Sequence, residues 1–354
     1  MEKLKIAFFG TPDFAVPTLE MLHNHPEVDL VQVVSMPDRK SGRGQKLQSP
    51  PVALFAKTNK IPLLQTENIN KEDDTLLFYQ NKGLDAVIVL AFAQFLGSKV
   101  LKIPKKGCFN IHTSLLPSYR GAAPIQHALL NGDEFTGVSI QKMVKKMDAG
   151  DVALSNEVKI SKNENFGQLY TRLKFQAALS INIFLKNLIN DNLTYTNQDE
   201  SKVTFAPSLK REDGYIDFST MNFIEIKNKM RAFDPWPGIY CFLGKKRLKI
   251  FSIRQSQDTV PPGQTRVDSN ELLIGCLNAT IRLSEVQLEG KKRSSDIDLL
   301  NGLKNSNAIE IGGRKKAIIY ALKNSDPYEI ILIAGKGHET YQDLGNKKIF
   351  LSDK

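Results

Sequence analysis

The N-terminal half of the chain alternates between continuous apolar runs and stretches in which apolar residues recur at helical spacing. The runs occupy residues 4–9, 30–34 and 86–91, and none of them alternates with polar residues. A stretch that opens at Asp13, after Gly10, shows the helical spacing: Phe14, Val16, Leu19 and Leu22. Continuous runs are typical of parallel strands buried on both faces. The pattern predicts a doubly wound α/β domain, whose ligands bind beyond the carboxyl ends of the strands.

The pattern changes in the second half of the chain. Helical periodicity spans residues 166–188, and the polar stretch 190–198 that follows is interpreted as a connection. Short β-rich segments then follow one another, separated by Gly, Pro, Asn and Asp: residues 214–218, 240–242, 248–253, 271–276 and 279–283. Such segments predict a small barrel or sandwich. The predicted division has four parts: a domain at 1–190, a linker at 191–204, a β domain at 205–304 and a tail at 305–354.

Composition narrows the class of protein. The 354 residues are 41% hydrophobic and 24% charged, as in ordinary globular proteins, and no apolar run reaches the roughly 20 residues of a membrane helix. The N-terminus lacks the pattern of a signal peptide, so we expect a cytoplasmic protein. Three widely spaced cysteines indicate neither a disulfide framework nor a thiolate metal site: Cys108, Cys241 and Cys276. A net charge of +10 favours a polyanionic partner if the basic residues gather on one face.

The first candidate catalytic residues lie in the segment CFNIHTSLLPSYRG, residues 108–121. Asn110 and His112 are two residues apart, so on a strand both side chains project from the same face. An imidazole can donate to a developing oxyanion or move a proton near neutral pH, and an amide can donate without titrating. An isolated histidine is more often a packed structural residue, but Pro117 and Gly121 mark a loop just past a strand end, where α/β enzymes bind ligands.

A second candidate is the sequence MDAGD at residues 147–151. Asp148 or Asp151 could approach His112, orient its ring and favour the charged form of the imidazole. A turn carboxylate can equally cap the backbone amides of its own turn. The residues alone leave these alternatives open.

A third candidate is the basic segment PDRKSGRGQKLQSPP at residues 37–51. A flexible loop that carries Arg39, Arg43 and Lys46 can follow phosphate groups, although a solvated surface loop has the same composition. The segment lacks the GxxxxGK[ST] spacing of a P-loop, and GTPDFA at residues 10–15 lacks the dinucleotide motif GxGxxG. Neither segment therefore predicts a nucleotide cofactor.

In combination, these segments resemble the methionyl-tRNA formyltransferase family. The resemblance covers residues 3–303 and rests on motifs that occur in the family's order: FFGTPDFAVPTLEML, PDRKSGRGQKLQSPPV, FNIHTSLLPSYRGAAPIQ, TGVSIQKMVKKMDAGD, RAFDPWPG and VQLEGKKR. It implies a Rossmann-like formyltransferase domain, a linker, and a small open, OB-like β-barrel domain that helps to hold the tRNA. It also implies transfer of the formyl group of 10-formyltetrahydrofolate, the co-substrate, to the α-amino group of methionyl-initiator tRNA.

The resemblance also implies roles for individual residues. The family's catalytic residues match Asn110, His112 and Asp148. Its folate-binding segment matches Ser114, Leu115, Leu116 and Pro117. The basic insertion that enters the acceptor end of the tRNA matches residues 42–46, so Arg43, together with Arg39 and Lys46, is the expected tRNA contact.

The mechanism that this resemblance implies needs no metal, because the formyl donor is already an activated formamide. The neutral amine attacks the formyl carbon while Asn110 and His112 stabilise the tetrahedral oxyanion, and Asp148 orients His112 and favours its protonation. Proton transfer to the folate nitrogen then releases tetrahydrofolate. Three positions near the expected folate pocket depart from the family pattern, which bears on affinity rather than on the type of reaction: Ala93, Gly97 and Thr113.

The tail is not a usual part of a formyltransferase. Residues 313–354 resemble the C-terminal end of the UDP-N-acetylmuramoyl-tripeptide synthetase family, in which positions matching Gly335 and Glu339 bind the incoming amino acid. The chain has neither the ATP loop nor the central domain of such a ligase. We therefore expect a C-terminal α/β fragment that is a fusion remnant or a gene-junction product, and a retained function of the tail stays open as the alternative.

Two other functions remain open on the sequence. A formyltransferase acting on a small amine such as a nucleotide sugar would use the same Asn, His and Asp but would not require the basic segment 37–51. A non-catalytic RNA-binding protein would explain the charge and leave Asn110 and His112 without a role. For the leading hypothesis we expect a monomer that binds initiator methionyl-tRNA, with no membrane and no obligate protein partner.

Overall fold

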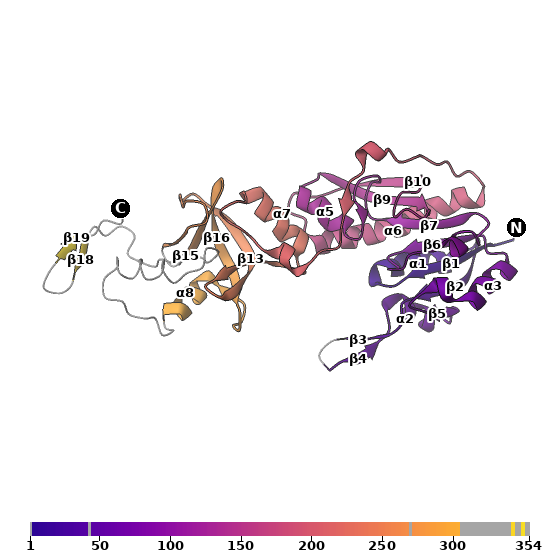
Figure 1. Cartoon of the computed structure of the whole chain (residues 1–354), viewed down its shortest axis with the longest axis horizontal. Coiled ribbons are helices and arrows are strands. Elements are labelled where there is room, and N and C mark those ends of the chain that lie inside the picture. The colour runs from indigo at the N-terminus through magenta and orange to yellow at the C-terminus, as the bar shows by residue number, and fades with distance from the viewer. Residues whose placement is uncertain (1, 42–43, 269–270, 305–340, 344–347, 351–354) are drawn as a thin grey trace. The chain divides into compact units, whose positions relative to one another are not determined.

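The computed structural model describes residues 2–41, 44–268, 271–304, 341–343 and 348–350. The chain divides into two compact units, Met1–Ser208 and Leu209–Lys354 (Figure 1). The first unit is built on a seven-stranded sheet and the second on a six-stranded sheet. In the tail, β18 (Tyr341–Asp343) and β19 (Lys348–Phe350) pair antiparallel.

The predicted apolar runs form the centre of the first sheet. Parallel strands lie there in the order β7-β6-β1-β2-β5. Their bounds are β1 (Leu4–Gly10), β2 (Val28–Ser35), β5 (Leu63–Gln65), β6 (Ala86–Leu90) and β7 (Gly107–His112). Because β1 lies between β2 and β6, the winding of the sheet changes direction at β1, and ligand sites in such sheets lie beyond the strand ends at that point.

One edge of the sheet is not parallel. β9 (Phe135–Lys142) pairs antiparallel with β7, and β10 (Val152–Lys159) pairs antiparallel with β9. The doubly wound prediction therefore holds for the parallel strands, and the sheet as a whole is mixed. The turn between β9 and β10 leaves β9 opposite Phe109, near the start of β7, and Asp148 within this turn reaches back to Asn110 and His112.

Helices cover both faces of the sheet, which explains why its strands are apolar without alternation. On one face, Ala7 and Phe9 belong to a buried cluster with Leu76 and Tyr79 of α3 (Asp73–Lys82). On the other face, the rings of Phe109 and Phe184 lie 4.8 Å apart, and Phe184 belongs to α6 (Phe166–Ile189), which confirms the helix predicted at 166–188. The other helices of this unit are α1 (Val16–Asn24), α2 (Pro51–Thr58), α4 (Ser98–Leu101) and α5 (Pro124–Asn131).

The chain that follows α6 stays in contact with the first unit. Thr196 forms a bridge with Val152 of β10, and β11 (Phe205–Ala206) pairs parallel with β8 (Arg120–Gly121). The close pairing requires a glycine at Gly121, because a Cβ there would lie 2.7 Å from the carbonyl oxygen of Ala206. The stretch 191–204, which the sequence predicts to be a linker, thus runs beside the loop that follows β7.

The second unit is an antiparallel sheet. Its main path runs β12-β13-β16-β15-β14, with β17 paired to β16. The elements are α7 (Phe223–Phe233), β12 (Ile239–Leu243), β13 (Lys246–Ser256), β14 (Thr265–Asp268), β15 (Glu271–Cys276), β16 (Ala279–Leu288), β17 (Ser294–Ser295) and α8 (Asp296–Lys304). Strands predicted at 240–242, 248–253, 271–276 and 279–283 are confirmed.

The strand predicted at 214–218 is wrong. The short helix η4 (Arg211–Gly214) occupies its start, and Tyr215 then makes a single bridge to Tyr240. The side chain of Asp213 accepts a hydrogen bond from the Lys210 backbone N–H, which stabilises a helical turn at this point. Local capping therefore overrides the β-like pattern of the residues.

Candidate active site

A cavity of about 680 Å³ lies where the first sheet changes its direction of winding. Its wall comes from the chain that follows β1, from the loop 91–96 after β6, and from the end of β7. Most of the side chains around it are apolar, and Phe166 and Tyr170 of α6 contribute aromatic surface. A cavity of this size, with a few polar groups at one place, is typical of a small-molecule site.

β7 brings the polar groups of its last residues to this cavity. Asn110 and His112 both line it, as their two-residue spacing predicts. His112 is only 6% exposed, and its Nε2 lies 2.8 Å from the carbonyl oxygen of Tyr119. Because a carbonyl can only accept, Nε2 carries the proton in this hydrogen bond, which leaves Nδ1 as the other titratable position of the ring.

Asp148 meets these residues from the turn between β9 and β10. Its Oδ1 accepts from Gln141 Nε2 at 2.8 Å and from Asn110 Nδ2 at 3.3 Å, and its Oδ2 accepts from the Gly121 backbone N–H at 2.9 Å. His112 Nδ1 lies 3.8 Å from Oδ2. The carboxylate is thus held by uncharged donors beside the imidazole, close enough to stabilise a positive charge on the ring.

The structure separates the two carboxylates of the MDAGD turn. Asp148 is half-buried at the cavity, whereas Asp151 is exposed and its backbone carbonyl accepts from the Lys142 N–H. Asp148 also has a φ of 50°, in the left-handed region that is uncommon for residues other than glycine. Of the two candidates, Asp148 is therefore the one that approaches His112.

The segment 114–117 lies next to the cavity and is not part of its wall as described, which includes Thr113 instead. Ser114 is fully buried and donates through Oγ to the Ser118 carbonyl, while Ser139 Oγ donates to the Ser114 carbonyl and accepts from the Leu116 N–H. These bonds fix the backbone of the loop after β7. Leu115 and Pro117 are both half-buried there.

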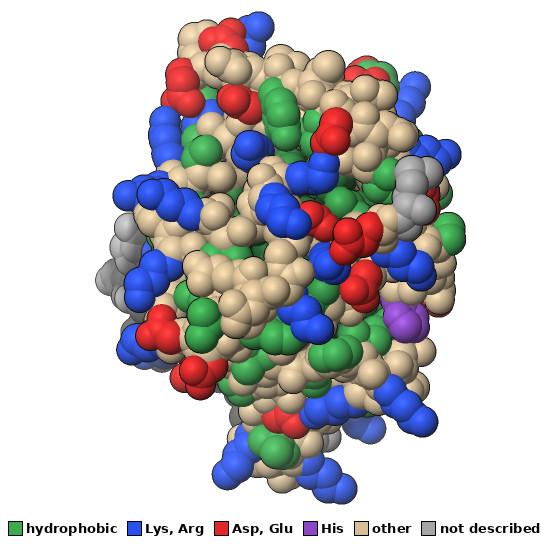
Figure 2. Space-filling view, turned by 90° about the vertical axis from the view of Figure 1, so that its right-hand side faces the viewer, with side chains coloured by type: hydrophobic (Ala, Val, Ile, Leu, Met, Phe, Trp, Pro, Cys, Tyr) green, Lys and Arg blue, Asp and Glu red, His purple; other side chains and the backbone are tan. Residues whose placement is uncertain are grey.

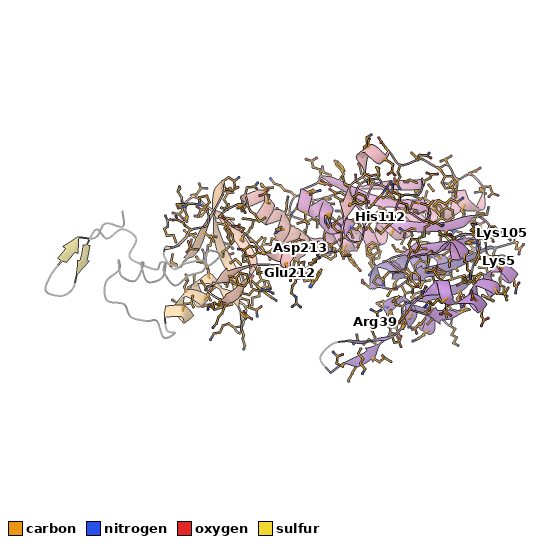
Figure 3. All side chains as sticks on the ribbon, in the orientation of Figure 1. Lys5, Arg39, Lys105, His112, Glu212 and Asp213 are labelled. Carbon is orange, nitrogen blue, oxygen red and sulfur yellow. The ribbon has the colours of Figure 1, made fainter. Side chains whose placement is uncertain are left out.

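The basic segment forms a hairpin that projects from the first unit (Figure 1). β3 (Arg39–Ser41) and β4 (Lys46–Gln48) pair antiparallel, and the side chains of Arg39 and Lys46 are exposed. Arg43 lies outside the described residues. Figure 3 places Arg39 on this hairpin and His112 on the sheet, so the two predicted sets of residues occupy separate parts of the unit.

Asp38 anchors the base of this hairpin. Its Oδ1 accepts from Gln65 Nε2 at 2.6 Å, and its Oδ2 accepts from Ser49 Oγ at 2.9 Å. These hydrogen bonds, together with Lys57 nearby, hold the pKa of Asp38 below its ordinary value, so the anchor is charged at neutral pH. The hairpin is fixed where it leaves the unit, although its basic side chains are exposed.

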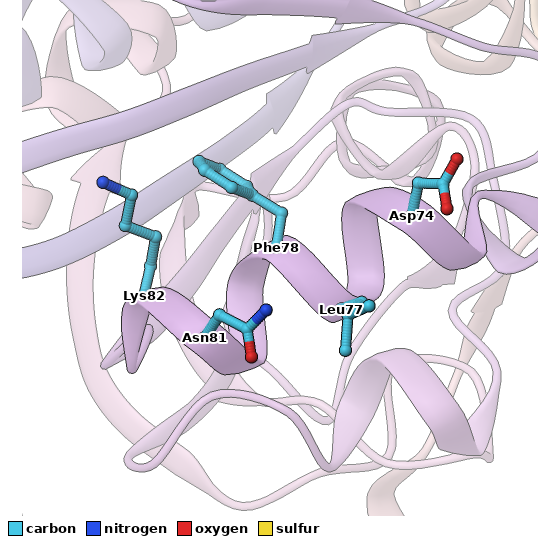
Figure 4. A pocket seen from close by; sticks show the side chains of 5 residues that line it. All are labelled: Asp74, Leu77, Phe78, Asn81 and Lys82. Atoms are coloured by element: carbon cyan, nitrogen blue, oxygen red, sulfur yellow. The ribbon is translucent and has the colours of Figure 1, made fainter.

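Other candidate features have no chemistry of their own. Burial raises the pKa of both Cys108 and Cys241 to about 12, so their thiols are protonated at neutral pH. A second hollow lies on one face of α3 and is lined by residues of that helix alone (Figure 4).

Within the described ranges, no group of three or more His, Cys, Asp or Glu is arranged to bind a metal ion. None of the helices in the described part of the chain is long and apolar enough to cross a membrane.

Figure 2 shows how basic side chains are distributed on one face of the molecule. On the face that Figure 2 displays, Lys and Arg are interspersed with acidic side chains and do not form one continuous patch. The net charge therefore does not identify a binding surface on this face. The projecting hairpin offers a more definite location for positive charge.

Comparison with known proteins identifies the family. The family models for formyl transferase and for the formyl transferase C-terminal domain match residues 4–183 and 208–304. The methionyl-tRNA formyltransferase of Geobacter metallireducens is 40% identical over 313 residues, which cover 88% of this chain and 100% of the relative. The chain belongs to the methionyl-tRNA formyltransferase family. The family's enzyme from Thermotoga sp. is also 40% identical, over 88% of this chain and 99% of the relative.

A solved structure shares the fold of this family member. The N-formyltransferase from Helicobacter canadensis, in complex with folinic acid and dTDP-3-aminofucose, aligns with a TM-score of 0.59 and 20% identity. The alignment covers 80% of this chain and 98% of the other. The two family models end before the tail, and the predicted matches at Gly335 and Glu339 lie outside the described residues.

The departures from the family pattern have local structural consequences. Ala93 lines the cavity with a φ of 63°, where glycine would meet no steric cost. Gly97 donates its N–H to Asn70 Oδ1 at 2.6 Å, and a proline could not make this bond. Both positions lie in the loop between β6 and α4.

Sequence reasoning missed two glutamines at the site. Gln141 donates to the carboxylate of Asp148 from the neighbouring strand β9, and Gln198, in the chain after α6, donates to the backbone carbonyls of Asp148 and Gly150. Gln141 lies within the motif TGVSIQKMVKKMDAGD, but the residue type alone indicates no catalytic role, and neither glutamine is near Asn110 in the sequence. The one sequence signal for Gln141 is its position shortly before MDAGD, because that turn is predicted to approach His112 at the end of β7.

Proposed function

We propose that this chain transfers the formyl group of 10-formyltetrahydrofolate to the α-amino group of methionyl-initiator tRNA, and so produces formylmethionyl-tRNA for translation initiation. The proposal rests above all on the meeting of Asn110, His112 and Asp148 at one cavity of a chain in this family. Neither an RNA-binding protein nor a structural domain requires an imidazole and a carboxylate to converge on an apolar pocket.

The cavity suits a folate. Its largely apolar wall and volume of about 680 Å³ fit a flat heteroaromatic ligand with an aromatic extension, and its polar groups are gathered near the end of β7. The solved N-formyltransferase with folinic acid has the same fold. The bound co-substrate would supply an activated formyl carbon. We propose that the loop 114–117 supports this ligand by fixing the backbone next to Thr113, which lies in the wall.

In the proposed mechanism the residues of the chain stabilise charge and move one proton. Asn110 donates an N–H to the oxyanion that forms when the amine attacks, and this donor is in place before the reaction. His112 is oriented by the Tyr119 carbonyl at Nε2, so Nδ1 is the nitrogen that takes the proton that the amine loses as its bond to the formyl carbon forms. Asp148, 3.8 Å from Nδ1, stabilises the imidazolium that results. The same proton would pass to the folate nitrogen as the bond between that nitrogen and the formyl carbon breaks, which releases tetrahydrofolate.

Recognition of the tRNA is assigned to exposed basic residues. In our proposal Arg39 and Lys46 on the hairpin, together with Arg43, contact phosphates near the acceptor end. The antiparallel sheet of the second unit acts as the OB-like barrel that helps to hold the tRNA, on a domain division of 1–190, 191–204 and 205–304. The enzyme would act as a cytoplasmic monomer with no metal.

The experiment that tests this function is formyl transfer from 10-formyltetrahydrofolate to methionyl-tRNA by the full chain. Activity in the wild type that is lost in His112→Ala, with folate binding retained, would support the proposal. Folate binding without transfer to charged tRNA would overturn it and favour a small-amine acceptor such as a nucleotide sugar. Near-normal turnover in His112→Ala would overturn the role of this residue.

The tail is proposed to be dispensable for this reaction. The family models cover the chain only as far as residue 304, and the first of them includes every residue that lines the cavity. A truncation after Leu303 should keep the wild-type turnover with methionyl-tRNA. A large loss of turnover in this truncation, with a cooperative unfolding transition retained, would show that the tail takes part.

A further inference from the structure

Gln198 connects the chain after α6 to the turn that carries Asp148. Its Nε2 donates to the backbone carbonyl of Asp148 at 2.8 Å and to that of Gly150 at 2.7 Å. Its Oε1 accepts from Arg120, at 3.0 Å from Nε and 2.9 Å from Nη2. One amide group therefore ties together the turn, the loop after β7 and the chain that leads out of the first unit.

Arg120 fixes which way this amide points. The Arg120 side chain is only 1% exposed, and a guanidinium can only donate, so it must face the oxygen of the Gln198 amide. The nitrogen of the amide is then forced toward the two carbonyls of the turn. Glu200 completes the arrangement, because its carboxylate accepts from Arg120 Nη2 at 2.9 Å and from Lys146 Nζ at 2.7 Å.

The turn that carries Asp148 requires hydrogen bonds that hold its backbone in place. Asp148 has a φ of 50°, which for a residue with a Cβ is less favourable than the ordinary helical or extended conformations. Its carboxylate is useful only if it stays beside His112, and its contacts to Asn110 and His112, at 3.3 and 3.8 Å, are longer than strong hydrogen bonds. The backbone bonds from Gln198 are shorter, and they reach the carbonyl of the strained residue itself and the carbonyl of Gly150, two residues later.

We propose that Gln198 is a positioning residue that holds Asp148 in the geometry required for formyl transfer, an inference that rests on the proposed function. Gln198 touches neither substrate in this role. It acts through the backbone of the turn, and Arg120 sets the direction in which it acts. A displacement of about 1 Å at a catalytic group is enough to lower a rate by about 100-fold.

The kinetic test uses Gln198→Glu. This variant keeps an oxygen that accepts from Arg120, but a carboxylate cannot donate to the carbonyls of Asp148 and Gly150. We expect kcat to fall by about 10- to 100-fold, while the KM values for both substrates stay within about twofold of the wild type. Gln80→Glu, the same chemical change on the exposed face of α3, should leave all three parameters unchanged. Wild-type kcat in Gln198→Glu would overturn the proposal.

A second measurement does not depend on activity. The Gly121 N–H donates to Asp148 Oδ2, so its hydrogen exchange reports whether the carboxylate is in place. In Gln198→Glu we expect faster exchange at Gly121 with unchanged exchange in the strand β6. Unchanged exchange at Gly121, or uniformly faster exchange in both places, would overturn the positioning role. If the wild type transferred no formyl group to methionyl-tRNA, the proposed function would fail, whereas this exchange experiment would still test the constraint on Asp148.

Discussion

The cavity and the basic hairpin of the first unit differ in how their polar side chains are held. At the cavity, the carboxylate of Asp148 is surrounded by donors from β7, β9 and the loop after β7. On the hairpin, Arg39 and Lys46 are exposed. Charge stabilisation in a reaction requires groups that are fixed before the substrate arrives. Contact with phosphates requires charge that can exchange counterions for a polyanion.

The difference lies in the side chains and not in the backbone. The hairpin is anchored at its base by Asp38, just as the turn with Asp148 is held by Gln198. Both loops therefore leave the sheet in a defined direction. What distinguishes them is that the carboxylate of Asp148 lies within a hydrogen-bonded network, whereas the side chains of Arg39 and Lys46 are exposed.

The largest expected effect on turnover comes from a substitution at the cavity, where the polar groups are held by hydrogen bonds. Asn110→Ala should lower kcat by about 10²- to 10³-fold, because it removes a donor to the oxyanion. The dissociation constant for the folate should change little, since the apolar wall of the cavity is intact. Steady-state kinetics with methionyl-tRNA and equilibrium folate binding measure the two quantities. Asn81→Ala on α3 is the matched control, and equal losses in both variants would refute the role of Asn110.

A smaller effect, on the KM for methionyl-tRNA, is expected from substitutions on the basic hairpin. The double variant Arg39→Ala/Lys46→Ala should raise the KM for methionyl-tRNA by about tenfold and flatten its dependence on salt, because fewer counterions are released. kcat at saturating tRNA should remain that of the wild type. Lys82→Ala, an exposed lysine of α3, serves as the control. If the salt dependence stayed unchanged in the double variant, the hairpin would not contact phosphates.

The wall of the cavity offers a test of strain. Ala93→Gly should raise the free energy of unfolding by up to about 1 kcal/mol, because relief of the left-handed backbone exceeds the added entropy of the unfolded chain. Chemical denaturation of the wild type and the variant measures this difference. A lower stability in the variant would mean that the methyl group of Ala93 contributes more by packing than its backbone costs.

The smallest expected effect concerns Glu200 at the edge of the network. Hydrogen bonds from Arg120 and Lys146 lower its pKa from 4.5 to about 2. A lowered carboxyl pKa stabilises the fold above the unfolded value and loses that contribution as the pH falls through the folded value. Unfolding between pH 4.5 and 2 should therefore depend less on pH in Glu200→Gln than in the wild type. Identical pH profiles would show that the ion pairs of Glu200 with Arg120 and Lys146 contribute nothing to stability.

The sequence predicted the parts of the molecule that local pattern determines. Continuous apolar runs correctly gave β1, β2 and β6, because a strand covered on both faces has no polar side. The spacing of Asn110 and His112 correctly predicted a shared face. The strand expected at 214–218 failed because capping by Asp213 is a short-range interaction that the β pattern does not contain.

The remaining parts of the site depend on contacts between distant segments. The residues of MDAGD could not decide between Asp148 and Asp151, since the choice is made by the path of the turn between two antiparallel strands that the sequence did not reveal. Gln198 lies 50 residues after Asp148, and its role follows only from the return of the chain to the first unit. Contacts of this kind, between segments that are distant in the sequence, cannot be predicted from the spacing of residues.

The position of Gln198 also orders the assembly of the site during synthesis. The strands β1, β6 and β7 and both members of the antiparallel edge precede α6 in the chain, so a nascent polypeptide that ends at residue 190 already contains the whole sheet. It lacks the amide that holds the turn. On the proposed role of Gln198, a fragment of that length contains the strands of the site and lacks the residue that holds Asp148 in place, so the catalytic centre is completed only after synthesis has passed the end of α6.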